Sequence, residues 1–272
     1  MSKTLEQLLS EQEVAAIIEM YQNNLSLREI EKRTHHGRVA LTKMLERLGI
    51  KTTKGNHYRK YFFDFDFFET INTELKAYWL GFLYADGCIL PQDPRGYGEQ
   101  EFKLQIAEQD LEILEHFKAD LNSTYPIRCD NKSIKNPNAQ NQVLQSLRSQ
   151  KTVNDLKRLG CVENKSLTLQ FPQEHQVPQH LIYHFIRGYF DGDGSISNYN
   201  GAYQISFVGT EAFIKKLASY FEGGSILPDT RRQNSWYFNL GGNEQVKTAY
   251  HQMYDGATRY MKRKFEKFQP LL

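Results

Sequence analysis

Apolar residues near the start of the chain recur every three or four positions, which is the spacing of one face of an α-helix. The pattern predicts three short helices: one over residues 11–22, one that begins after Ser26 and ends near Thr34, and one over about 36–48. The apolar positions expected to face inward on the third helix are Val39, Leu41, Leu45 and Leu48. Gly49 follows and can end this helix. Three short helices with a tight second turn are typical of a helix-turn-helix.

The charges of this segment favour a polyanionic ligand. The whole chain of 272 residues carries a formal net charge of only +2. However, residues 1–60 hold 11 Lys and Arg against 7 Asp and Glu, and nine of these basic residues lie between Lys32 and Lys60, where Glu46 is the one acid. Such a block suits a polyanion, although the solvated surface of an ordinary helix can also be rich in lysine and arginine.

A helix-turn-helix would place its third helix in the major groove of double-stranded DNA. We then expect Arg38, Thr42 and Lys43 to reach base edges, and the basic residues from Lys51 to Lys60 to lie on phosphates. The alternative is a three-helix module for dimerisation or packing. The clustering of basic residues on and just after the third helix favours DNA binding.

The composition changes between residues 50 and 70, from basic and polar to aromatic and acidic. The aromatic side chains there are Tyr61, Phe62, Phe63, Phe65, Phe67 and Phe68. They are too apolar for a free linker, so we expect them to dock on the following domain. The predicted organisation is a helix-turn-helix domain with a basic linker over 1–60, followed by two repeats over 61–172 and 173–272.

The overall composition excludes several classes of protein. The hydrophobic share of 40% and the charged share of 24% are typical of a globular chain with a substantial core. No apolar run approaches the roughly 20 residues of a membrane span, and the first residues do not resemble a secretory signal. We therefore expect no membrane partner and a cytoplasmic location, on the nucleoid if the host is a bacterium or a phage. Cys88, Cys129 and Cys161 fit neither a disulfide framework nor a zinc pair, and we expect buried or half-buried thiols.

The chain contains an internal repeat. The segments WLGFLYADGCI at 79–89 and IRGYFDGDGSI at 186–196 are offset by 107 residues. After each copy the pattern predicts strands alternating with amphipathic helices. The strand-like segments are 102–107, 142–148, 203–208 and 235–240. We therefore predict a duplicated unit of helices and strands.

The repeated segment can bring two carboxylates together. Each copy predicts an apolar helix with small residues four positions apart, which lets two helices approach closely. The small residues are Gly81, Ala85, Gly188 and Gly192. Each helix ends at an acid followed by glycine. If the helices pack through their small residues, Asp86 and Asp193 meet at one end of the pair.

Two adjacent carboxylates repel each other unless a cation lies between them or one of them takes up a proton. Oxygen ligands favour a hard ion such as Mg²⁺, which can activate water and stabilise a leaving phosphate oxygen. A single Gly-xxx-Ala segment followed by Asp-Gly is usually only a packing and capping device. Two copies at matching positions favour a functional site over a packing and capping device.

The segments WLGFLYADG and IRGYFDGDG resemble the two copies of the signature of the LAGLIDADG homing endonucleases in their monomeric, two-motif form. The resemblance covers roughly residues 65–272. It implies a mixed α+β fold, in which a duplicated αββαββα unit with pseudo-two-fold symmetry forms a saddle of two antiparallel sheets on the DNA major groove. The protein would then be a monomer with an internal pseudo-dimer, and the motif helices would form the interface between the repeats.

The resemblance also implies a metal site. Asp86 and Asp193 stand at the eighth motif position and would bind the divalent metals that cut both strands, together with main-chain carbonyls near Ala85 and Gly192. The expected ion is Mg²⁺, with Mn²⁺ as a substitute.

Other positions match the family less closely or by placement only. The sixth motif position, often acidic, is Tyr84 in the first copy and Asp191 in the second, so Asp191 is a further candidate for the metal environment. The stretches LKRLGCVENKS and YMKRKFEKF are similar to the ends of the two repeats. In the family a lysine at these places reaches the active site to stabilise phosphate charge or to order solvent, which implies catalytic roles for Lys165 and Lys264.

The predicted strands would face the DNA with alternate residues. Gln142, Arg148, Arg231 and Arg232 have the chemistry to contact bases or phosphates. Together these features predict a sequence-specific, double-strand DNA endonuclease that hydrolyses phosphodiester bonds at a long site, with the helix-turn-helix extending the footprint. Three alternatives stay open: a non-cutting transcriptional regulator of the same fold, an intron RNA maturase, and a protein-interaction module in which both acids are only helix caps.

Overall fold

The computed structural model describes residues 4–22, 25–50, 52, 60–95, 98–132 and 140–272. The chain divides into two compact units, Met1–Phe62 and Phe63–Leu272. The basic segment that was expected to lie on phosphates falls largely outside the described residues. Each unit has a hydrophobic core of its own, so the two are described separately.

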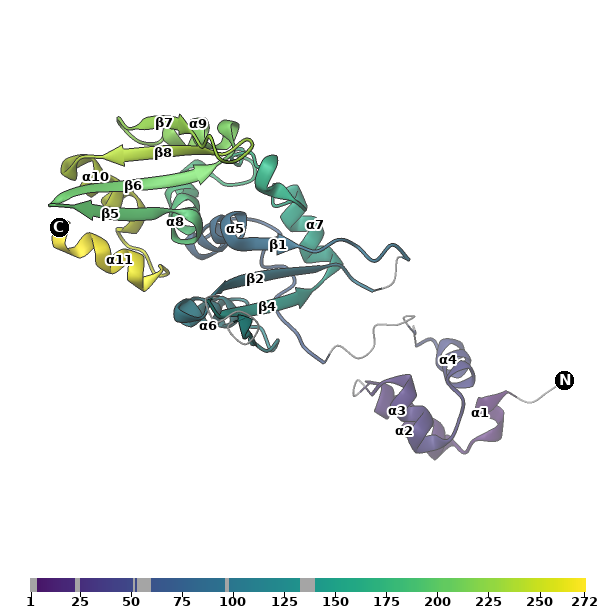
Figure 1. Cartoon of the computed structure of the whole chain (residues 1–272). Helices are drawn as coiled ribbons and strands as arrows, with labels where there is room; N and C mark the ends of the chain where they lie inside the picture. Colours follow the sequence, from purple (N-terminus) through teal and green to yellow (C-terminus); the bar gives the residue numbers. More distant parts are fainter. Residues whose placement is uncertain (1–3, 23–24, 51, 53–59, 96–97, 133–139) are drawn as a thin grey trace. The chain divides into compact units, whose positions relative to one another are not determined.

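The regular elements described in the first unit are helices. Its helices are α1 (Leu5–Leu8), α2 (Glu11–Gln22), α3 (Leu27–Thr34) and α4 (Arg38–Arg47), as Figure 1 shows. The three predicted helices are confirmed, and α1 is an addition. Ser26 begins α3 with a capping box, because its hydroxyl accepts from the Glu29 amide while the Glu29 carboxylate accepts from the Ser26 amide. His35, in the left-handed conformation, ends α3 and begins the short turn to α4.

The prediction for the inward face of α4 is wrong at two positions. Leu41, Met44 and Leu45 are fully buried, whereas Val39 is 71% exposed and Leu48 is 44% exposed. The buried residues follow the helical spacing of three and four, and Val39 lies two positions before the first of them. Two positions rotate a side chain by about 200° around the helix, so Val39 faces away from the core.

The second unit contains two copies of one arrangement. The first copy runs through α5 (Glu74–Asp86), β1 (Gly87–Ile89), β2 (Glu101–Ala107), η1 (Glu108–Asp110), α6 (Leu111–Asp120), β3 (Arg128–Asp130), β4 (Gln142–Arg148), α7 (Gln150–Arg158) and η3 (Lys165–Leu167). The second runs through η4 (Gln179–Leu181), α8 (Ile182–Asp193), β5 (Ser195–Tyr199), β6 (Ala202–Gly209), α9 (Glu211–Ala218), β7 (Ser225–Pro228), β8 (Trp236–Gly241), α10 (Asn243–Tyr254), α11 (Lys262–Phe268) and η5 (Gln269–Leu271). The predicted mixed α+β class and the duplicated αββαββα order are confirmed.

Each copy forms one four-stranded antiparallel sheet. The strand orders are β1-β2-β4-β3 and β5-β6-β8-β7, so the two sheets have the same topology. Side chains along β2 and β4 alternate between buried and half-buried or exposed, which leaves one face of the sheet open. In Figure 1, α5 and α8 lie side by side at the centre of the unit with one sheet on either side.

The core of the second unit is rich in aromatic side chains and extends beyond the sheets. Phe63, Phe67 and Phe68 are buried in it, as the sequence predicted for this stretch, whereas Phe62 is 49% exposed. Cys161 is buried, but Cys88 and Cys129 are exposed, contrary to expectation, because alternation along β1 turns Cys88 away from its buried neighbours and β3 is an edge strand. Among the described residues, every helix is too short or too polar to span a bilayer.

Candidate active site at the paired helices

The two central helices touch through their glycines. A Cβ added to Gly81 would lie 2.0 Å from the carbonyl oxygen of Phe185, and one added to Gly188 would lie 2.0 Å from the carbonyl oxygen of Tyr78. The two contacts are equivalent, since each glycine of one helix meets a carbonyl of the other. Further along, a Cβ on Gly192 would lie 2.3 Å from the Cβ of Ala85. The backbones of α5 and α8 are therefore as close as glycine allows.

This packing brings Asp86 and Asp193 to the same end of the helix pair. Asp86 ends α5 and Asp193 ends α8, and Oδ2 of Asp86 lies only 3.2 Å from the place that a Cβ of Gly192 would occupy. Burial, with a further contribution from the nearby Asp193 carboxylate, raises the pKa of Asp86 to about 7. Burial also raises the pKa of Asp193, whose side chain keeps an exposed surface. The two carboxylates therefore lie near each other, and burial disfavours the charged form of both.

The raised pKa predicts a pH-dependent stability. The folded protein keeps a proton on Asp86 up to about pH 7, while the unfolded chain releases it near the ordinary value of 3.8. In EDTA, the free energy of unfolding should therefore fall as the pH rises from about 4 to 7, by up to about 4 kcal/mol. Urea unfolding at several pH values measures this, and Asp86→Asn should remove this component. Parallel curves for the native protein and the variant would contradict the prediction.

A lysine lies at the same end of each motif helix. Nζ of Lys264 donates to the carbonyl oxygens of Phe190, Asp191 and Gly192, at 2.7, 2.7 and 3.0 Å. Nζ of Lys165 donates to the carbonyl oxygens of Ala85, at 3.3 Å, and Gly87. Carbonyls in the last turn of a helix lack helical partners in general, although that of Phe190 also accepts from the amide of Gly194 at 2.8 Å. A cation at such a helix end also suits the helix dipole.

The two lysines differ in the hydrogen-bond donors that remain for a ligand. An ammonium group has three N–H donors, and Lys264, which is only 4% exposed, uses all three on the helix. Burial lowers the pKa of Lys264 to about 8. Lys165 is half-buried and donates to two carbonyls of the described residues. Lys264 can therefore act on a ligand through its charge, whereas Lys165 can also offer a hydrogen bond.

Asp191 has a structural role in place of the expected one near a metal. It is fully buried, its Oδ1 accepts from the hydroxyl of Tyr254 at 2.7 Å, and its Oδ2 accepts from the hydroxyl of Tyr78 at 3.0 Å and the amide of Met261 at 2.7 Å. Both oxygens are thus used within the core. The corresponding Tyr84 of the first copy is also buried and donates to the carbonyl of Leu159.

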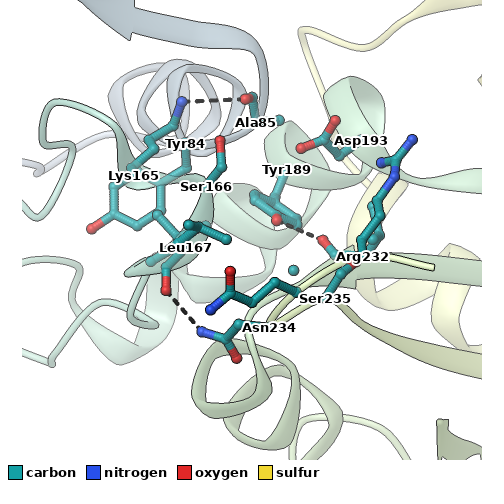
Figure 2. A pocket seen from close by; sticks show the side chains of 14 residues that line it. Tyr84, Ala85, Lys165, Ser166, Leu167, Tyr189, Asp193, Arg232, Asn234 and Ser235 are labelled. Atoms are coloured by element: carbon teal, nitrogen blue, oxygen red, sulfur yellow. Dashed lines mark hydrogen bonds between the residues drawn. The ribbon is translucent and has the colours of Figure 1, made fainter. Parts of the chain in front are cut away.

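A cavity of about 510 Å³ opens beside the carboxylate pair. Lys165, Asp193 and Arg232 line it, together with part of α5, the end of β6 and the loop between β7 and β8 (Figure 2). Figure 2 shows the guanidinium of Arg232 next to the carboxylate of Asp193. Burial raises the pKa of Asp193, and the positive charges of Lys165, Lys264 and Arg232 partly offset that rise. The structure thus brings one predicted DNA-contacting residue to the candidate active site.

The other predicted DNA contacts in this unit lie on the sheets or their loops. Gln142 and Arg148 are at the two ends of β4, and Arg148 pairs with Glu101 of β2 at 2.7 Å. Arg231 is 78% exposed and pairs with Asp229 at 3.1 Å. Sequence reasoning missed other polar side chains of the open faces, which the alternation of the predicted strands could have identified: Lys103, Gln105, Ser206 and Asn239.

In the first unit, α3 and α4 are joined by the three residues 35–37, which gives the tight turn of a helix-turn-helix. Lys43 is exposed on α4. Nε of Arg38 pairs with Glu31 at 3.0 Å, and the hydroxyl of Thr42 donates to the carbonyl of Arg38 at 2.9 Å. The three side chains predicted to reach bases therefore share one region of α4, and two of them also have partners within the unit.

Among the residues that the structure describes, three ion pairs that the sequence did not reveal join the two repeats. They are Glu74–Arg187, Asp120–Arg259 and Asp110–Arg263, each at 2.7 Å. Arg187 is fully buried and also donates to the carbonyls of Met253 and Arg259. All three acids belong to the first copy and all three arginines to the second.

The carboxylate pair fits a hard divalent ion. Within the part of the chain that the structure describes, no group of three or more His, Cys, Asp or Glu side chains could hold a metal. Mg²⁺ does not need such a cage, since it usually keeps several waters and is held by one or two carboxylates together with substrate phosphates. Two carboxylates with raised pKa values at one end of a helix pair provide that donor set.

Two motif helices pack through glycines, and each continues into one of two equivalent antiparallel sheets. This fold is similar to that of solved LAGLIDADG homing endonucleases. A point mutant of I-SmaMI has this fold at a TM-score of 0.50 and 12% identity, over 74% of this chain and 89% of that chain. The LAGLIDADG homing endonuclease I-SmaMI, bound to cleaved DNA, has a TM-score of 0.48 and 12% identity, over 74% of this chain and 88% of that chain. The LAGLIDADG meganuclease I-AabMI, bound to uncleaved DNA, has a TM-score of 0.48 and 11% identity, over 74% of this chain and 89% of that chain. No protein-family profile and no curated protein matches the sequence.

Proposed function

We propose that this protein is a homing endonuclease, which cuts both strands of double-stranded DNA at a long, specific site by hydrolysis that depends on a divalent metal, Mg²⁺ or its substitute Mn²⁺. The observation that carries the proposal is the pair formed by Asp86 and Asp193, brought together by two equivalent helices, with Lys165 and Lys264 at the same helix ends. A structural cap would not need two coupled carboxylates beside a cavity. The shared fold supports the same function.

Asp86 and Asp193 would hold the metal. When bound, such an ion supplies activation of water and stabilisation of the leaving phosphate oxygen. The main-chain carbonyls of Ala85 and Gly192 lie at the same helix ends, where they accept hydrogen bonds from the lysines. The raised pKa of Asp86 means that the carboxylate pair must lose its proton before it can bind a cation.

Lys165 and Lys264 would stabilise different charges in the site. Lys165 lines the cavity and can donate a hydrogen bond to a phosphate oxygen, which stabilises the charge that develops during hydrolysis. Lys264 is fixed on the end of α8 and favours the ionised form of Asp86 and Asp193 through its charge. Arg232 adds positive charge on the side of Asp193.

DNA would bind to the open faces of the two sheets. These faces present amides, hydroxyls and a few basic groups, which suits base edges and phosphates. Gln142, Arg148 and Arg231 belong to this surface. The two copies within one chain would supply both halves of the site, so that a monomer suffices. The first unit would add contacts at a raised effective concentration.

Cleavage of genomic DNA from the source of the sequence tests the proposal. The protein is incubated with this DNA and Mg²⁺, and the broken ends are mapped by sequencing. Recurrent double-strand ends at one or a few loci, absent when EDTA is added, would establish the endonuclease and identify its target. Tight binding without a cut would favour the transcriptional regulator or the intron maturase instead.

The salt dependence of DNA binding tests the role of the first unit. Each lysine or arginine that neutralises a phosphate contributes about one to the slope of log K against log salt. Replacing both Arg38 and Lys43 with alanine should therefore reduce this slope by up to about two. The control is Lys215→Ala, which removes an exposed lysine paired with Glu211 on α9. Equal slopes for all three proteins would show that Arg38 and Lys43 neutralise no phosphate, which would leave only the base contacts expected of them.

A further inference from the structure

Val39 occupies a position that neither packing nor helix propensity explains. It lies in the first turn of α4 and is 71% exposed, while Leu41, Met44 and Leu45 fill the core from the opposite side of the helix. A β-branched side chain is a weaker helix former than alanine. Exposing a valine also forgoes the roughly 1.5–3 kcal/mol that its burial would provide.

The neighbours of Val39 indicate the kind of ligand. Thr42 and Lys43 lie three and four positions further on, so they share its face of the helix. Arg38 is held by Glu31, and the hydroxyl hydrogen of Thr42 is donated to the helix backbone. The face of Val39 thus presents an apolar group and, one turn away, a lysine, while the side chain of the adjacent Arg38 remains 63% exposed.

The surroundings favour DNA over a protein partner. Exposed basic side chains lie on both α3 and α4: Arg28, Lys32, Arg33 and Lys43. A neutral apolar partner would gain nothing from this positive charge, whereas a polyanion would. The major groove presents one prominent apolar group, the methyl group of thymine, and the first residues of the second helix of a helix-turn-helix are those that meet base edges.

We infer that Val39 contacts a thymine methyl group and makes the first unit select a T·A pair at that position. The inference rests on the proposed DNA binding and adds an apolar base contact, with a defined base pair, to the polar contacts already expected of α4. It requires no change in the chemistry of Asp86 and Asp193. Loss of the contact should therefore alter sequence preference and affinity without altering the cleavage step on bound DNA.

Selection from random duplexes tests the inference. The probe is a pool of random-sequence DNA duplexes, and the full chain carries Asp193→Asn so that bound DNA stays intact. We expect a preferred T·A pair that disappears from the pool selected with Val39→Ala added. Deoxyuridine in place of that thymine removes only the methyl group and should weaken binding about fourfold for the chain with Val39, since a buried methyl group is worth about 0.8 kcal/mol. With Val39→Ala, the uracil and thymine duplexes should bind equally.

Leu48 provides the matched control, because it is also exposed but follows the last turn of α4. The Leu48→Ala variant should still bind the uracil duplex about fourfold more weakly than the thymine duplex. Binding that is unaffected by uracil at every position would overturn the inference and leave the endonuclease intact. A change in oligomeric state with Val39→Ala, without a change in the uracil response, would overturn it in favour of a protein contact. No binding to any duplex would overturn both this inference and the proposed function.

Discussion

Replacing Asp86 or Asp193 with asparagine is expected to reduce DNA cleavage at least about a thousandfold while leaving DNA binding in place. Asparagine has nearly the same shape but no charge, so it removes the attraction for a divalent ion, whose stabilisation of the reaction is worth several kcal/mol. The fold should not suffer, because burial already disfavours the charged form of both side chains. Linearisation of a supercoiled plasmid that carries the mapped site measures cleavage, and a gel-shift assay measures binding.

A matched control is available in the same unit. Asp255 is an aspartate of the surface, where its carboxylate pairs with His251 at 3.0 Å. Asp255→Asn should cut at the native rate. If Asp86→Asn or Asp193→Asn also cut at the native rate, the carboxylates would be helix caps only, and the protein-interaction module would become the better hypothesis.

Gly188→Ala is expected to destabilise the second unit by about 3 kcal/mol or more, a large part of the roughly 5–15 kcal/mol by which a typical domain is stable. The new methyl group would lie 2.0 Å from the carbonyl oxygen of Tyr78 and 2.9 Å from the amide nitrogen of Phe82. Backbone atoms of a buried helix cannot rotate away as a side chain can, so the two helices would have to separate. Thermal unfolding followed by circular dichroism measures the effect.

Gly241→Ala is the control for that experiment. A Cβ at Gly241 would meet only Oε1 of Gln204, at 3.9 Å, which is an ordinary contact. This substitution should change the melting temperature by no more than a few degrees. A melting temperature of Gly188→Ala equal to that of Gly241→Ala would show that the helices of the free protein are not packed through their glycines.

The duplication and the fold could be predicted because they depend on short segments of the sequence. The repeated segments place glycine and aspartate at matching positions, and the alternation of apolar residues identifies β2, β4, β6 and β8. The meeting of Asp86 with Asp193 followed from the small residues alone. What the sequence could not provide is the state of the carboxylates, since burial depends on the whole surrounding core.

Other features depend on residues that are far apart in the chain. Lys264 could be placed near the active site, but its three hydrogen bonds to the end of α8 depend on the path of some seventy residues in between. The motif position of Asp191 is often acidic, which made this residue a candidate for the metal environment. In the structure its carboxylate accepts hydrogen bonds from Tyr78 and Tyr254, which come from distant segments of the chain. The misplacement of Val39 has a local cause, because one apolar residue at the end of a helical pattern fits more than one face.

The three ion pairs between the repeats determine which halves can be partners. The repeat offset of 107 residues places Leu181 of the second copy at the position of Glu74, and Leu80 of the first copy at the position of Arg187. Two first halves brought together would set Glu74 against a leucine, and two second halves would leave the buried Arg187 without an acid, a loss of about 3–5 kcal/mol for a broken buried pair. The halves have thus diverged into complementary subunits of one chain. If they were produced as separate polypeptides, each would select the other over its own copy, which gives a route to a heterodimer that assembles only when both halves are present.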